Sequence, residues 1–212
     1  MKFTWATRIT LFRILLIVPF VMLMLNINDT QYPQGQRELF RYIATAIFLI
    51  MAMSDAADGY LARHKKQVTK LGAFLDPLAD KLLMTCACLL LASKRAMVPG
   101  FQLPIEVIVI IIAKDMFLLI GFFVVFMFTH EVHVLPVKIG KVATALQLVM
   151  VMAVLLAPEM SRYIPYGQYY IWFLRVLWWS AAGTAILATG IYIRAGSGYI
   201  EEVEKAMQQN NH

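Results

Sequence analysis

Long apolar stretches alternate with short polar joins along the chain. A helix that crosses a bilayer needs about 20 mostly apolar residues, and a ruler of that length marks candidate spans in this sequence. The six candidates cover residues 9–27, 39–61, 71–93, 103–128, 140–157 and 169–193. The joins contain Pro, Gly and charged residues, and none is long enough for another domain. The pattern therefore predicts an all-α integral membrane bundle, with a six-span domain over residues 1–195 and a polar tail over residues 196–212.

Composition supports a membrane protein. Of the 212 residues, 60% are hydrophobic and only 15% are charged, whereas a soluble domain is apolar over about half of its residues. The formal net charge of +6 also suits a nucleic-acid binder, but the hydrophobicity argues against that class. Cys86 and Cys88 are two residues apart, so on a helix they point in different directions and form no common site.

The Lys and Arg residues predict the orientation. They gather near the N-terminus, in the second and fourth joins and in the C-terminal tail, and cytoplasmic loops carry the excess of such residues. Both termini are therefore expected on the cytoplasmic side. A cytoplasm-facing site and only two cysteines fit a bacterial inner membrane.

Four aspartates lie inside or beside the second and third candidate spans. Burying one ionised Asp in a membrane helix costs at least about 2.5 kcal/mol, so four of them need a compensating charge. Asp55 and Asp58 share one helix face because they are three residues apart, and Asp76 and Asp80 share another because they are four apart. Two antiparallel helices with a short basic join can bring all four carboxylates together.

The helical rise sets the depth of this cluster. Asp55 would lie about 12 Å from Arg63, and Asp80 about 15 Å from Lys70, which places the acids below the cytoplasmic face in a polar cavity open to that side. Oxygen-only ligands favour Mg²⁺ or Mn²⁺, and four acids can hold two ions, an arrangement that suits phosphoryl displacement. Gly59 and Gly72 allow a ligand or a helix to approach the backbone closely.

The spacing of these residues matches a family signature. The pattern D-x-x-D-G-x-x-A-R, eight residues, G-x-x-x-D-x-x-x-D runs without a gap from Asp55 to Asp80, and it resembles that of the CDP-alcohol phosphatidyltransferases. The resemblance implies transfer of a phosphatidyl group from CDP-diacylglycerol to an alcohol, release of CMP, and a homodimer. It implies a metal-ligand set and a set of residues at the cytidine diphosphate site. The implied metal ligands are Asp55, Asp58, Asp76 and Asp80, with Asp80 also as catalytic base, and the implied nucleotide-site residues are Asp58, Gly59, Ala62, Arg63 and Gly72.

Other segments bear on the acceptor alcohol. Thr10-Leu-Phe-Arg13 resembles a T-x-x-R element of glycerophosphate-using members, and the segment from Lys138 to Gln147 resembles the G-K-x-x-T-x-x-Q element of glycerophosphate and cardiolipin synthases. An anionic acceptor phosphate suits basic residues gathered near the acids, although isolated basic residues also serve as snorkelling anchors. Glycerol 3-phosphate is the expected acceptor. The candidate acceptor-binding residues are Thr10, Arg13, Lys114, Lys138 and Lys141.

One departure from the family pattern leaves an alternative open. Glycerophosphate-using members commonly carry Arg-Glu in the fourth span, where this chain has Lys114-Asp115. In this respect the chain looks closer to the cardiolipin synthases of the family, which use phosphatidylglycerol. The purely structural interpretation is that Lys114 and Asp115 form an ion pair. A cation-coupled transporter is the alternative from another class. It is disfavoured because the acids gather in one hairpin toward one face.

Overall fold

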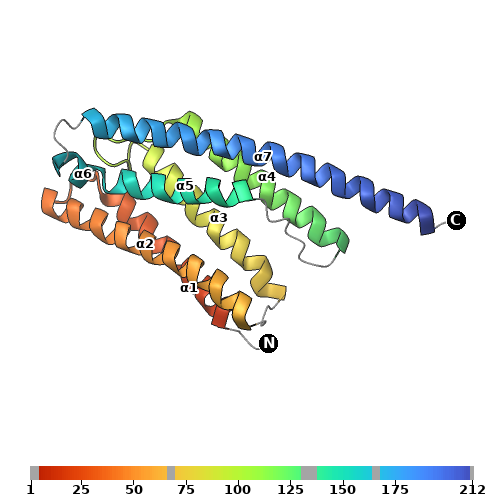
Figure 1. The fold of residues 1–212 in the computed structure, drawn as a ribbon. Coiled ribbons are helices and arrows are strands. Elements are labelled where there is room, and N and C mark those ends of the chain that lie inside the picture. Colours follow the sequence, from red (N-terminus) through yellow and green to blue (C-terminus); the bar gives the residue numbers. More distant parts are fainter. Residues whose placement is uncertain (1–4, 66–69, 130–137, 164–167, 211–212) are drawn as a thin grey trace.

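A computed structural model describes residues 5–65, 70–129, 138–163 and 168–210. Within these ranges only the helical backbone is described at 5–7, 9, 55–65, 70–77, 122, 124–129, 138, 168 and 195–210. The described chain is all-helical apart from one isolated bridge between Val98 and Phe101. Its helices are α1 (Trp5–Asn26), α2 (Gln34–Lys65), α3 (Lys70–Ala92), α4 (Ile105–Thr129), α5 (Lys138–Leu155), α6 (Ala157–Tyr163) and α7 (Gln168–Asn210) (Figure 1).

Each predicted span coincides with one of these helices, to within a few residues at most ends. One feature differs from the prediction, because the short helix α6 lies in a segment expected to be a loop. The last helix, α7, runs through the predicted border between domain and tail at residues 195 and 196 and ends at Asn210. The division into domain and tail stays a prediction.

The helices pack as two groups. α1 packs against both α2 and α3, while α7 packs against both α4 and α5. α3 joins the groups because it also contacts α4 and α5. Large side chains with almost no solvent exposure fill the space between the helices. They include Phe20, Phe48, Met84, Ile111 and Met150.

The outer surface is strongly apolar. Leu15 on α1, Ile105 on α4 and Val176 on α7 are 69%, 66% and 67% exposed, and large exposed apolar areas mark interaction sites for membranes or proteins. Among the described residues, one helix, Tyr169–Arg194, is long and apolar enough to cross a bilayer, and the bent pair Ile139–Leu155 and Ala157–Tyr163 passes the same test together. The six-span layout and the orientation of the termini stay predictions.

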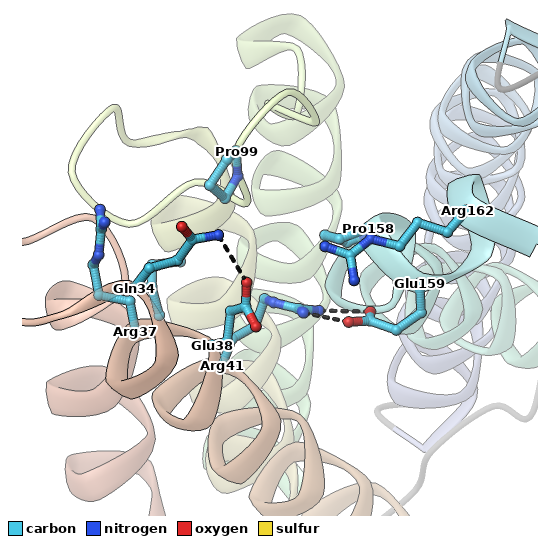
Figure 2. A pocket seen from close by; sticks show the side chains of 9 residues that line it. Gln34, Arg37, Glu38, Arg41, Pro99, Pro158, Glu159 and Arg162 are labelled. Carbon is cyan, nitrogen blue, oxygen red and sulfur yellow. Dashed lines mark hydrogen bonds and ion pairs between the residues drawn. The ribbon is translucent and has the colours of Figure 1, made fainter.

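Arg41 of α2 stabilises the bend of 70° between α5 and α6. Its guanidinium donates a hydrogen bond of 2.8 Å to the carbonyl oxygen of Leu155, at the end of α5, and it forms a two-pronged ion pair with Glu159 of α6. The last carbonyls of a helix lack intrahelical partners, and an acid in the first turn of a helix interacts well with its dipole. The Arg41 side chain therefore satisfies one carbonyl at the end of α5 and pairs with the acid in the first turn of α6. Figure 2 shows its contact with Glu159.

Candidate active site

The aspartate motif lies on the last turns of α2 and the first half of α3. Figure 1 shows these two segments at the same end of the bundle, close to the start of α1. In Figure 1 α2 ends and α3 begins at this end, and the two helices run in opposite directions. That the four carboxylates meet there stays a prediction. The predicted site residues whose side chains lie outside the described part of the structure are Asp55, Asp58, Gly59, Ala62, Arg63, Gly72, Asp76 and Lys138.

Asp80 is the one aspartate of the motif whose side chain the structure describes. Its side chain is 21% exposed, and its carboxylate lies 3.4 Å from the ammonium of Lys81. The same ammonium lies 3.1 Å from Oδ1 of Asp115 on α4. Lys81 therefore bridges a partly accessible carboxylate of the motif to a deeply buried carboxylate on the next helix.

Asp115 is the centre of this buried network. Its side chain is 2% exposed, and its Oδ1 also lies 3.1 Å from the ammonium of Lys114. Lys114 is 1% exposed and donates a hydrogen bond of 3.2 Å to Oε1 of Gln147 on α5. The two lysines and the two aspartates balance in formal charge. Because buried charges are stable only when paired, this balance lets the network lie among three helices.

The sequence anticipated only part of this network. The ion pair between Lys114 and Asp115 is present, so the structural interpretation of that dipeptide holds. Lys114 was also a candidate for acceptor binding. In the structure its buried ammonium contacts Asp115 and Gln147. Lys81 was missed because it adjoins Asp80 instead of sharing a helix face with it. Gln147 was part of a recognised segment, but a role for its amide required knowledge of the facing helix.

The remaining acceptor candidates occupy different environments. Thr10 and Arg13 are 1% and 2% exposed on α1, which packs against the helices that carry the aspartate motif. Lys141 is exposed on α5. The structure therefore brings Thr10 and Arg13 into the bundle interior and leaves Lys141 on its surface.

Gly140, inside the G-K element of α5, is a point of close helix contact. A Cβ atom at this position would lie 2.3 Å from the hydroxyl oxygen of Tyr192 on α7, well inside van der Waals contact. The absence of a side chain at Gly140 lets the Tyr192 ring lie against the first turn of α5, and a larger residue would displace the Tyr192 hydroxyl.

The donor chemistry of the motif fits a hard divalent cation. The side chains that the structure describes contain no group of three or more His, Cys, Asp or Glu residues suited to a metal ion. The motif has three further aspartates, Asp55 and Asp58 on α2 and Asp76 on α3, one helical turn before Asp80. Carboxylate oxygens without His or Cys are the ligands that Mg²⁺ and Mn²⁺ prefer.

Comparison with known proteins identifies the family. A family model described as CDP-alcohol phosphatidyltransferase matches residues 3–189. The chain belongs to this family. Three similar proteins are each named CDP-diacylglycerol–glycerol-3-phosphate 3-phosphatidyltransferase. The resemblance of the aspartate motif to CDP-alcohol phosphatidyltransferases is thereby confirmed.

The three relatives differ in how much of their length the chain matches. The Bacillus subtilis protein is 36% identical over 150 residues, which is 70% of each chain. The Haemophilus influenzae protein is 39% identical over 95 residues, 45% of this chain and 46% of the relative. The Escherichia coli K12 protein is 42% identical over 90 residues, 42% of this chain and 44% of the relative. The matches to the last two thus span less than half of those relatives.

Proposed function

We propose that this chain transfers the phosphatidyl group of CDP-diacylglycerol to glycerol 3-phosphate, giving phosphatidylglycerophosphate and CMP. The observation that carries the proposal is the gapless aspartate motif in a chain of the CDP-alcohol phosphatidyltransferase family. The names of the Bacillus subtilis and Haemophilus influenzae relatives support glycerol 3-phosphate as the acceptor.

The reaction forms one phosphorus–oxygen bond and breaks another. The acceptor hydroxyl oxygen attacks the phosphorus that bears the diacylglycerol, the proton of that hydroxyl passes to the Asp80 carboxylate, and the bond to CMP breaks with its electron pair on the departing phosphate. A base must reach the hydroxyl of the bound acceptor. The partial exposure of Asp80, with 21% of its side chain accessible, suits this role.

Two Mg²⁺ or Mn²⁺ ions, held by Asp55, Asp58, Asp76 and Asp80, would neutralise the diphosphate and stabilise the leaving group. Arg63 presents a forked cation to phosphate oxygens. Gly59, Ala62 and Gly72 leave room for the cytidine diphosphate to approach the helices closely. Asp58 contributes to both the metal site and the nucleotide site.

The acceptor phosphate requires positive charge near the base. Thr10 and Arg13 are buried on α1, and Arg13 supplies a bidentate donor for a phosphate. Lys138 and Lys141, at the start of α5, complete the basic surroundings by attracting an anionic acceptor. Lys114 acts through Asp115 and Lys81, because its buried ammonium fixes the carboxylate that in turn holds Lys81 beside Asp80.

The enzyme works in a membrane in this proposal. The apolar helix Tyr169–Arg194 and the exposed apolar side chains on α1, α4 and α7 support insertion into a bilayer. Six helices span the bacterial inner membrane, both termini face the cytoplasm, and the aspartate cavity opens to that side. A homodimer is the expected assembly by analogy with the family.

A second acceptor, phosphatidylglycerol, is favoured by one observation. Lys114-Asp115 replaces the Arg-Glu pair common in glycerophosphate-using members. With phosphatidylglycerol the same chemistry would yield cardiolipin. The acceptor assay must therefore offer both alcohols separately.

The test follows CMP release by purified protein in detergent with CDP-diacylglycerol and Mg²⁺ or Mn²⁺. Glycerol 3-phosphate, phosphatidylglycerol and inositol phosphate are supplied in separate reactions, each with a chelator-treated control. We expect metal-dependent release with glycerol 3-phosphate and little with the others. Release with phosphatidylglycerol alone would transfer the assignment to cardiolipin synthesis, and no release above the chelated control with any alcohol would overturn the enzyme proposal.

A further inference from the structure

A pocket of about 270 Å³ lies at the end of the bundle away from the aspartate motif. Its walls are the first turns of α2, the short helix α6, and Pro99 in the connection between α3 and α4 (Figure 2). Drug-sized ligands usually occupy pockets of about 300 to 1,000 Å³, so this volume suits a small group. The proposed reaction uses none of the residues that line it.

The acidic side chains of the pocket already have partners. Glu159 accepts hydrogen bonds from Arg41 and from the hydroxyl of Tyr42. Glu38 accepts a hydrogen bond of 3.2 Å from the amide of Gln34. Both carboxylates are therefore engaged by neighbouring residues of the protein.

Among the described residues, two guanidinium groups of the pocket have no anionic partner, that of the half-buried Arg37 and that of the exposed Arg162. Arg37 and Arg162 both line it, and no carboxylate within the described part of the chain forms an ion pair with either. The Nε atom of Arg37 is buried and makes no hydrogen bond to any described group. With Arg41, the pocket holds three arginines against two glutamates, so its formal charge is positive.

An acceptor placed in the pocket would stabilise the buried Nε of Arg37, because a buried donor without a partner is costly. Guanidinium groups bind phosphate with particular strength because their planar fork presents several donors to tetrahedral oxygens. We propose that the pocket binds a phosphate group, supplied either by a phospholipid headgroup or by a soluble phosphate compound. On the six-span layout proposed above, the pocket lies where the apolar parts of α1 and α2 end, which is the level of the lipid phosphates.

The experiment measures binding to the purified full-length protein in detergent with three probes. They are inorganic phosphate, short-chain phosphatidic acid, and the diacylglycerol with the same chains but no phosphate. The Arg37→Gln/Arg162→Gln double variant is compared with native protein. Arg95→Gln serves as the matched control, because Arg95 is an exposed basic residue of the same connection as Pro99 and does not line the pocket.

Loss of two charge-assisted contacts should weaken phosphate binding at least about tenfold in the double variant. The control variant should bind like native protein, and diacylglycerol binding should not change. CMP release should be unaffected, which shows that the double variant is folded. Weakening with phosphatidic acid alone identifies a lipid as the source, and weakening with both phosphate probes shows that the phosphate group suffices. Equal binding by native and double-variant protein, or equal weakening by Arg95→Gln, would overturn the proposal.

Discussion

Replacing Asp115 by Asn tests whether the buried network is held by charge. The substitution keeps the size and one oxygen of the side chain but removes the negative charge that faces two ammonium groups at 3.1 Å. At an effective dielectric constant of about 20, one such contact is worth about 5 kcal/mol before desolvation is subtracted. Breaking a buried ion pair by removing one partner typically costs about 3–5 kcal/mol. We expect a loss of that size in the free energy of unfolding.

The measurement is unfolding in mixed micelles by SDS titration, with native protein and the variant at equal detergent composition. The Lys114→Met/Asp115→Asn double variant supplies the control, because it also removes one of the two stranded ammonium groups while Lys81 keeps Asp80. The double variant should lose less stability than the two single variants together, by about 1–3 kcal/mol.

The alternative is that these contacts are ordinary polar contacts between membrane helices. Such contacts average about 0.6 kcal/mol and reach only about 1.7 kcal/mol. A loss below about 1 kcal/mol for Asp115→Asn, with additive single variants, would refute the view that the network is an ion-pair cluster. In that case Lys81 would need another reason to lie beside Asp80.

Further predictions concern the base, a helix contact and an ion pair. Asp80→Asn should abolish CMP release while metal binding, followed by calorimetry with Mn²⁺, is partly retained; full turnover would remove Asp80 from its role. Gly140→Ala should lower thermal stability because the new methyl group displaces Tyr192, whereas Gly183→Ala, with open space around it, should stabilise α7 by about 0.5–1 kcal/mol; equal effects would contradict the steric reason. Hydrogen bonds from Arg41, opposed in part by desolvation, lower the pKa of Glu159 to about 2. The contribution of this ion pair to the free energy of unfolding should be complete above about pH 4.5 and lost as the pH falls toward 2. The Glu159→Gln variant should lack this pH dependence. The same loss of stability at low pH in native protein and in the variant would contradict the assignment to Glu159.

The sequence predicted the helices well because the length of an apolar run fixes a helix nearly by itself. It did not predict α6, since a helix of seven residues has no apolar run to reveal it. The sequence also did not predict that Lys81 lies between Asp80 and Asp115. Charged residues inside apolar segments indicate that partners exist, but the partner depends on how helices far apart in the chain rotate against each other. Lys81 meets Asp115 across 34 positions, and Arg41 meets Glu159 across 118.

The ion pair between Arg41 and Glu159 has a mechanical consequence. It ties α2, from one group of helices, to the bend between α5 and α6, from the other. Parting α2 from α5 and α6 would leave two charged groups without their partners, so this contact resists separation of the two groups at its end of the bundle. Beside the aspartate motif, the ion pair between Lys81 and Asp115 joins α3 of one group to α4 of the other. Ion pairs therefore hold the two groups together at two separate levels of the bundle.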